Sequence, residues 1–126
     1  LQIDLPDEFN LVGYEGYVHQ ILVNLIQNAA DAVEGNKEPS VAISLEAHHG
    51  QIHIQVRDNG KGISQDKLMR IFDPFFTTKP VGKGTGLGLY ISYNLATDQC
   101  RGELTASNHP DGGAQFTLSL PLGEPQ

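Results

Sequence analysis

Glycine is concentrated in one part of this 126-residue chain. Six of its 14 glycines lie between Gly60 and Gly88. Inside this stretch, residues 73–86 combine two prolines and three glycines and show no helical or strand periodicity. A segment of this kind predicts a long irregular loop, and long loops in compact domains are usually lids or binding segments. We therefore expect the functional site of this chain in and around the glycine-rich stretch.

The segments on either side of this loop show the spacing of regular helices and strands. Helical spacing of apolar residues, together with Ser64 as an N-cap, predicts helices over residues 15–33, 64–71 and 87–96. Alternating apolar and polar residues predict two hairpins, from strands 41–45 and 52–56 and from strands 103–107 and 114–120. In the third helix, one side carries Leu87, Tyr90, Ile91 and Leu95. This order predicts an α+β fold with helices layered on one face of a mainly antiparallel sheet.

Composition limits the function of the chain as well as its fold. Fifteen acidic against eight basic side chains, a net charge of −7 and a pI near 5.0 argue against a nucleic-acid partner. The single cysteine, Cys100, expected to be half-buried at a helix end, excludes an internal disulfide and favours a reducing, cytoplasmic setting. No apolar run approaches the roughly 20 residues of a membrane span, so no membrane contact is expected from this domain itself.

Polar residues on the first predicted helix also follow helical spacing. They are Gln20, Asn24, Gln27, Asn28 and Asp31. Asn24, Asn28 and Asp31 lie within about 40° of one another around the helix axis. A solvated helix face is one interpretation, but such a face usually carries Lys and Glu rather than carboxamides. Because amide oxygens suit a hard cation and its water molecules, the other interpretation is a cation site.

The turn after the second predicted strand, residues 58–63, places an acidic residue beside two glycines. A plain tight turn would explain this pattern. The functional interpretation is that Gly60 and Gly62 let a flat ligand approach the backbone, while Asp58 accepts a hydrogen bond from an exocyclic amine such as that of adenine. Ile63 would then pack on the ring.

Glycines alternate with other residues over 82–88, directly before the third predicted helix. Bare backbone N–H groups and the positive end of the helix dipole together form an anion site, for which phosphate is the natural occupant. The spacing is neither that of a dinucleotide-binding loop nor that of a P-loop. Lys79 and Lys83 flank the glycines, either as phosphate ligands or as solubilising loop lysines.

Four segments of the chain together closely resemble the ATP-binding catalytic domain of bacterial sensor histidine kinases, part of a wider family that includes the gyrase, Hsp90 and MutL ATPases. In family order, they resemble the N box (residues 19–32), the first glycine box (58–62), the phenylalanine box (72–79) and the second glycine box (84–89). The resemblance spans essentially the whole chain. Four motifs in one order are far more specific than any one of them.

The resemblance implies a Bergerat fold, which is a two-layer α/β sandwich with three helices on one face of a mixed, mostly antiparallel sheet. ATP would lie between the N-box helix and a lid over residues 73–88. Asn28 would hold Mg²⁺, Asp58 would bind the N6 group of adenine, and residues 86–88 would contact the phosphates. The nucleotide site implied in this way comprises Asn28, Asp31, Asp58, Gly60, Gly62, Ile63, Phe75, Thr78, Lys79, Lys83, Gly84, Thr85, Gly86, Leu87 and Gly88.

Asn24 bears on which branch of the family the chain resembles. ATP-hydrolysing relatives carry a glutamate four residues before the metal-binding asparagine to activate water, and an amide cannot act as a base. The resemblance therefore implies a kinase with Asn24 and Asn28 as catalytic residues, in which ATP donates its γ-phosphoryl group to a side chain of another domain. The alternatives are a nucleotide-binding pseudokinase or interaction module and, less favoured, a gyrase-, Hsp90- or MutL-type ATPase.

The acceptor of that phosphoryl group is not found in this sequence. None of the histidines has the acidic neighbour and nearby proline of an acceptor helix; they are His19, His48, His49, His53 and His109. The resemblance implies that dimerisation and phosphoacceptor helices precede Leu1, so that residues 1–126 are the catalytic domain of a longer chain. It also implies a response regulator as the downstream partner.

Two positions depart from the family pattern. Ala114 stands where many relatives have a threonine next to the adenine-bound water, which concerns one hydrogen bond. Residues 100–102, Cys-Arg-Gly, replace a histidine and two glycines, and the sequence offers no physical reason for this change.

Overall fold

The helices and strands lie where the spacing of apolar residues predicts them. A computed structural model of the protein describes residues 15–74 and 88–121. Its elements are α1 (Glu15–Ala32), β1 (Val41–His48), β2 (Gln51–Asp58), α2 (Gln65–Leu68), α3 (Gly88–Asn94), the π-helix η1 (Leu95–Gln99), β3 (Glu103–Asn108) and β4 (Ala114–Pro121). Both predicted hairpins are present, and each strand is longer than predicted.

The strands form one antiparallel sheet in the order β1-β2-β4-β3. The two central strands, β2 and β4, alternate in burial along their length. Their buried apolar side chains share one face and are Ile52, Ile54, Val56, Phe116, Leu118 and Leu120. Polar side chains such as Gln55 and Thr117, which are paired across the two strands, occupy the opposite face. This alternation leaves one apolar face of the sheet to receive the helices.

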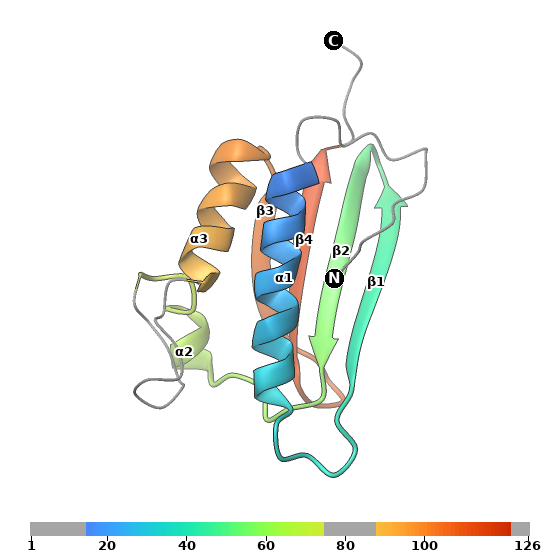
Figure 1. Cartoon of the computed structure of the whole chain (residues 1–126), viewed down its shortest axis with the longest axis vertical. Helices are drawn as coiled ribbons and strands as arrows, with labels where there is room; N and C mark the ends of the chain where they lie inside the picture. The colour runs from blue at the N-terminus through green and yellow to red at the C-terminus, as the bar shows by residue number, and fades with distance from the viewer. Residues whose placement is uncertain (1–14, 75–87, 122–126) are drawn as a thin grey trace.

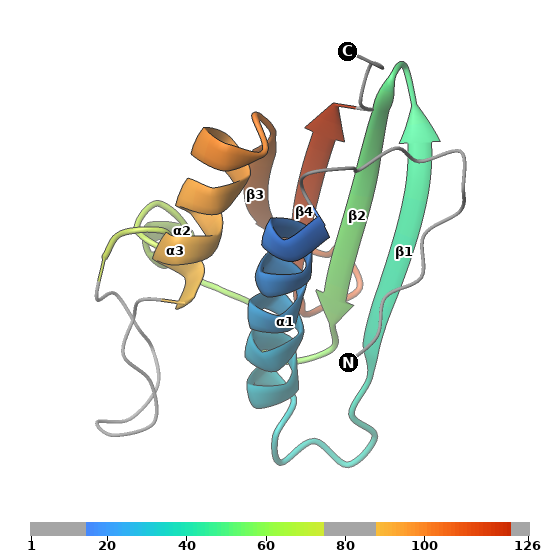
Figure 2. The ribbon, with the colours of Figure 1, turned by 45° about the horizontal axis from the view of Figure 1, so that its top comes forward.

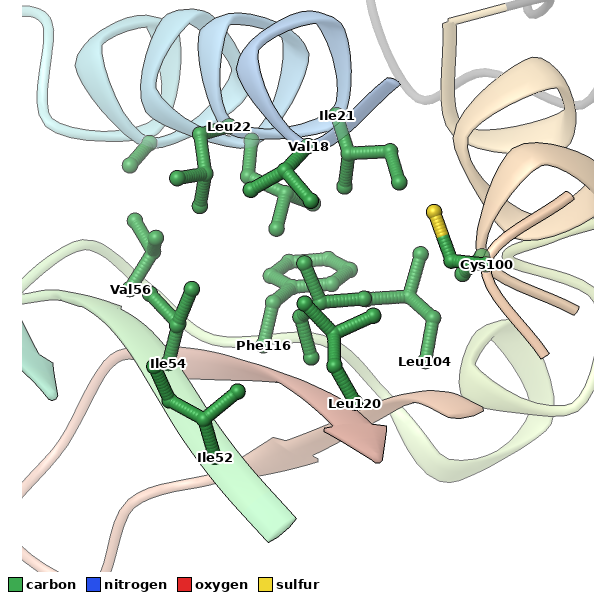
Figure 3. Packing of buried hydrophobic residues seen from close by; sticks show 14 of the residues in the cluster. Val18, Ile21, Leu22, Ile52, Ile54, Val56, Cys100, Leu104, Phe116 and Leu120 are labelled. Atoms are coloured by element: carbon green, nitrogen blue, oxygen red, sulfur yellow. The ribbon is translucent and has the colours of Figure 1, made fainter. Parts of the chain in front are cut away.

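Helix α1 covers the apolar face of the sheet (Figure 1). The side chains that it buries there are Val18, Ile21, Leu22, Leu25 and Ala29. Phe116 of β4 lies beneath α1, and Ile54 and Val56 of β2 pack beside it (Figure 3). Burial of each large apolar side chain contributes about 1.5–3 kcal/mol, so this contact between the two layers stabilises the fold.

Helix α3 lies beside α1, above β3, and the short α2 lies next to α3 (Figures 1 and 2). The helices and the open sheet form two layers, so the predicted sandwich is confirmed. Among the helices of the described segments, none has the length and apolar content needed to cross a bilayer.

The third predicted helix differs from its expected form. α3 ends at Asn94, and the chain continues to Gln99 in the wider turn of η1. Its deeply buried side chain is Ser92, whereas Ile91, on the predicted apolar side, is 38% exposed. The prediction is wrong for Ile91, because α3 meets α1 through the hydrogen-bonded Ser92, which a pattern of apolar residues does not reveal. Leu95, on the same predicted side, does pack against the core. Leu87 lies outside the described residues.

Two further details correct the predictions from sequence. Helix α2 is shorter than the predicted 64–71, and Ser64 occupies its N-cap position without a side-chain capping bond. Cys100 is fully buried rather than half-buried, and its side chain reaches the core near Leu104 (Figure 3). Burial raises the pKa of the Cys100 thiol, because an apolar environment disfavours the charged thiolate.

Candidate functional site

Asp58, the last residue of β2, is a buried carboxylate with 2% of its surface exposed. Its Oδ1 atom accepts two backbone hydrogen bonds, from the N–H of Gly60 at 2.8 Å and from the N–H of Ala114 at 3.2 Å. In the parts of the chain that the structure describes, the carboxylate accepts no further hydrogen bond. The protein therefore holds Asp58 in one orientation, and Oδ2 has no hydrogen-bond partner among these residues.

The glycines after Asp58 are required by contacts within the protein. A Cβ atom at Gly60 would lie 2.5 Å from the carbonyl oxygen of Ala32, at the end of α1. Gly62 has a φ of 81°, and a Cβ atom there would lie 2.8 Å from Oδ1 of Asn108. Close approach to the backbone of Ala32 explains Gly60, and the positive φ explains Gly62. Contact of the two glycines with a flat ligand remains a prediction.

Asn59 fastens the start of this turn to the loop between α1 and β1. Its Oδ1 atom accepts hydrogen bonds from the N–H of Ser40 at 2.9 Å and from Nδ2 of Asn36 at 3.2 Å. Its own Nδ2 donates to the carbonyl oxygen of Glu38 at 2.8 Å. Sequence reasoning missed Asn36 and Asn59, although asparagine beside a turn glycine is typical of such side-chain to backbone bonding.

Asn108, at the end of β3, holds the far end of the same turn. Its Oδ1 atom accepts a hydrogen bond from the N–H of Ile63 at 2.7 Å, and its Nδ2 donates to the carbonyl oxygen of Ile63 at 2.6 Å. Ile63 itself is partly buried and packs against the core. Asn108 was also missed from sequence, because its partner lies 45 residues away along the chain.

Asn24 joins α1 to α3. Its Nδ2 atom donates to the hydroxyl of Ser92 at 3.0 Å and lies 3.4 Å from the carbonyl oxygen of Gly88, the first residue of α3. Ser92 and Asp58 are the two buried polar residues in 15–74 and 88–121. The Asn24 amide is thus engaged by the protein, which makes it a link between two helices.

Asn28 and Asp31 lie further along the same face of α1. The Asn28 side chain is half-buried, and no described residue forms a hydrogen bond with its amide. Asp31 is also half-buried and accepts a hydrogen bond from Nε2 of Gln27 at 3.2 Å. The role of Asn28 as a ligand to a cation stays a prediction.

The loop that the sequence predicts as a lid lies mostly outside the described residues. The predicted site residues in that part are Phe75, Thr78, Lys79, Lys83, Gly84, Thr85, Gly86 and Leu87. Phe72, which begins the predicted phenylalanine box, packs at a tilt against Tyr93 of α3 with ring centroids 5.1 Å apart and meets Phe116 edge-on at 6.3 Å. These contacts anchor the start of the loop to α3 and to the core.

His, Cys, Asp and Glu side chains are not clustered in the described part of the chain. In residues 15–74 and 88–121, no group of three or more His, Cys, Asp or Glu side chains could hold a metal ion. On α2, a hydrogen bond from the Ser64 hydroxyl lowers the pKa of Asp66.

Both a family model and curated proteins match this chain. A family model described as "Histidine kinase-, DNA gyrase B-, and HSP90-like ATPase" matches residues 13–124. The two-component sensor PprA of Pseudomonas aeruginosa is 44% identical to this chain over 120 residues. That alignment covers 90% of this chain but 13% of PprA, so the chain spans a small part of the length of its curated relative.

Solved structures share the fold. The catalytic domain of histidine kinase ThkA, in a nucleotide-free form, aligns with a TM-score of 0.74 and 32% identity, covering 85% of this chain and 68% of that one. Full-length ShkA in complex with AMPPNP aligns with a TM-score of 0.72 and 30% identity, covering 88% of this chain and 22% of ShkA. Each alignment covers more than four fifths of this chain.

Proposed function

Because the chain belongs to the histidine kinase-, DNA gyrase B- and HSP90-like ATPase family, we propose that it is the catalytic domain of a two-component sensor histidine kinase. It binds Mg-ATP and donates the γ-phosphoryl group to a histidine of a separate dimerisation and phosphoacceptor domain. The observation that carries this proposal is the Asp58 carboxylate, which two backbone N–H groups hold in place with one oxygen available. The complex of the similar ShkA with AMPPNP supports a nucleotide as the ligand.

Asp58 selects adenine by the direction of its hydrogen bond. The available Oδ2 atom accepts a hydrogen bond from the N6 amine of adenine, and Ile63 packs against the ring. Guanine presents a carbonyl oxygen where adenine has this amine, and two acceptors repel each other. GTP therefore binds far more weakly than ATP.

Asn28 fits the role of a ligand to Mg²⁺. Its amide is half-buried, has no hydrogen-bond partner among the described residues, and lies on the α1 face that also carries Asn24. An amide oxygen suits this hard cation, and nucleotide phosphates and water complete its coordination. When bound, Mg²⁺ neutralises charge on the phosphates.

Asn24 argues for transfer to a protein side chain rather than to water. A carboxamide cannot take a proton from water, and the Nδ2 atom of Asn24 is already bonded to Ser92. Asn24 instead keeps the first turn of α3, where the phosphate-binding glycines end, in a defined position relative to Asn28. A gyrase-, Hsp90- or MutL-type hydrolase needs a base that this position does not provide.

The proposal includes partners that lie beyond residues 1–126. The nucleophile is a histidine on dimerisation and phosphoacceptor helices of the same kinase, and a response regulator receives the phosphoryl group from it. The names of relatives such as the two-component sensor PprA support this assignment. A single cysteine and a nucleotide cofactor are consistent with work in the cytoplasm.

The substitution Asp58→Asn tests the proposed adenine site. The amide oxygen can still accept the backbone N–H groups of Gly60 and Ala114, which turns the amide nitrogen toward the ligand, where it cannot accept from N6. Loss of a charged, buried hydrogen bond costs about 1.5–3 kcal/mol, so calorimetry should show ATP affinity falling by about 10- to 150-fold.

Asp111→Asn is the matched control, because Asp111 is an exposed carboxylate on the turn between β3 and β4. It should leave ATP affinity unchanged. Equal ATP affinity of Asp58→Asn and the unmodified protein would remove the basis of the proposal.

A further inference from the structure

The carboxamide of Asn108 binds the backbone of Ile63 in the way that a neighbouring strand would. It accepts from the Ile63 N–H at 2.7 Å and donates to the Ile63 carbonyl at 2.6 Å. Both distances are at the short end for such bonds, and both polar groups of one peptide residue are satisfied by one side chain. The position of Ile63 therefore depends directly on Asn108.

The same end of the sheet also holds Asp58. Asn108 is paired across the strands with Ala114, and the N–H of Ala114 donates to Oδ1 of Asp58 at 3.2 Å. The turn of residues 58–63 is thus held at its first residue from β4 and at its last residue from β3. These two residues of the turn are the ones that the proposed function places against adenine.

Gly62 of the turn lies close to the side chain of Asn108. Gly62 adopts a φ of 81°, and a Cβ atom there would come within 2.8 Å of Oδ1 of Asn108. Asn108 is an exposed residue at the end of a strand, so burial in the core does not explain its two hydrogen bonds. These two hydrogen bonds instead fix the distance between Ile63 and the end of the sheet where Asp58 lies.

We propose that Asn108 is a positioning residue for base recognition. It fixes the position of Ile63 relative to Asp58 and thereby determines the selectivity of the site for adenine. This inference rests on the proposed function. Asn108 acts through Ile63 and does not itself touch the nucleotide. Its loss should weaken recognition of the base and leave recognition of the phosphates unchanged.

The chemistry of the pair makes the proposal specific to a carboxamide. An aspartate at position 108 would accept from the Ile63 N–H but would place a second oxygen against the Ile63 carbonyl. A serine would make one of the two bonds, and an alanine neither. Base selectivity should therefore fall in the order Asn, Ser, Ala, with Asp no better than Ala.

The experiment compares Asn108→Ala, Asn108→Ser and Asn108→Asp with the unmodified chain. Calorimetry with Mg²⁺ measures affinity for ATP, GTP and inorganic tripolyphosphate, and hydrogen exchange measures protection of the Ile63 amide. Ser107→Ala is the control, because Ser107 is the exposed neighbour on the same strand. We expect Asn108→Ala to lose protection at Ile63 and about 10-fold in ATP affinity, the equivalent of one hydrogen bond, with tripolyphosphate and Ser107→Ala unchanged.

Three outcomes would overturn the proposal: an ATP-to-GTP ratio in Asn108→Ala within twofold of the unmodified chain, equal losses for ATP and tripolyphosphate, or unchanged protection of Ile63. If Asn108→Ala does not fold, the first two criteria apply to Asn108→Ser, which keeps one bond and can therefore retain protection of Ile63. Failure of the unmodified chain to bind ATP or tripolyphosphate would refute the proposed function itself, which is a different result from normal binding that does not depend on Asn108.

Discussion

At the scale of single residues, Arg101 is held in a left-handed backbone conformation, with a φ of 55°. It follows Cys100, whose N–H closes η1 on the carbonyl of Leu95 at 3.0 Å, and it precedes Gly102, whose N–H donates to the carbonyl of Ala96 at 2.7 Å. Left-handed residues at helix ends are usually glycine, because a Cβ atom costs roughly 1–2 kcal/mol there. The left-handed conformation explains why the family pattern has glycine at this position, and it strains the backbone of Arg101.

Arg101→Gly should therefore raise the free energy of unfolding by about 0.5–1 kcal/mol. The strain energy that glycine relieves in the folded state exceeds the free energy that unfolding gains from the more flexible glycine backbone. Thermal or urea denaturation measures this change. Arg101→Ala is the control, because it removes the guanidinium but keeps the Cβ atom. A gain in Arg101→Ala as large as that in Arg101→Gly would show that strain is not the cause.

Asn28 is the residue at which the proposed metal site can be tested separately from the base. Asn28→Ala should abolish phosphoryl transfer to an added acceptor domain while leaving most of the metal-free binding of ADP, because Asn28 contributes a ligand to the cation. Gln20→Ala, an exposed amide on the same helix, should retain transfer. If transfer rates survive Asn28→Ala, Asn28 is only a surface residue of α1.

At the scale of elements, the contact between α1 and α3 joins the two predicted halves of the site. The bond from Asn24 to the buried Ser92 hydroxyl lies in this contact, together with the approach of Asn24 to Gly88. Because a buried polar group without a partner is costly, this bond favours one relative position of the helices. Asn28 on α1 and the start of α3 are thereby kept in register.

We expect Asn24→Ala and Ser92→Ala each to lower the free energy of unfolding by about 1 kcal/mol, and the double variant to lose clearly less than the sum, because both changes remove the same bond. Urea denaturation of the four proteins provides the measurement. The pair Asn24→Ala and Ser107→Ala should be additive, since Ser107 lies on β3. Additive losses for Asn24 and Ser92 would contradict a direct coupling of the two helices.

At the scale of the whole molecule, the residues that form the core and the residues of the proposed site lie in different places. The core lies between α1 and the apolar face of β2 and β4, while the proposed site residues Asp58, Asn28 and Ile63 lie around the end of this core. Phosphoryl transfer depends mostly on placing a nucleophile in line with the γ-phosphate. The described layers carry residues of the proposed nucleotide site, and no acceptor-histidine motif occurs among residues 1–126.

Residues 1–126 alone should consequently neither label themselves with phosphate nor hydrolyse ATP at an appreciable rate. Adding a dimeric acceptor-helix domain should restore labelling on its histidine, as followed with γ-phosphate-labelled ATP. Labelling of the isolated chain at a histidine such as His19 would contradict this division of roles. Efficient hydrolysis that survives Asn24→Ala would instead favour the ATPase alternative.

The sequence by itself determined the elements and their layering. Helical spacing in residues 15–33 and alternation in the two hairpins are local patterns, and each predicts which side chains face the core without knowledge of the rest of the fold. The acidic residue Asp58 at a strand end and the amide Asn28 on the helix face could be identified in the same way, because a residue's place on its own element depends on sequence position alone.

Only the tertiary structure decided how these residues are held. The bonds from Asn108 to Ile63 and from Asn24 to Ser92 join residues far apart in the chain, and Gly60 is required by the carbonyl of Ala32. Such contacts depend on strand register and on how closely two elements approach, so a local pattern does not contain them. For the same reason, the left-handed turn after Cys100 became visible only where the chain closes η1 against the sheet.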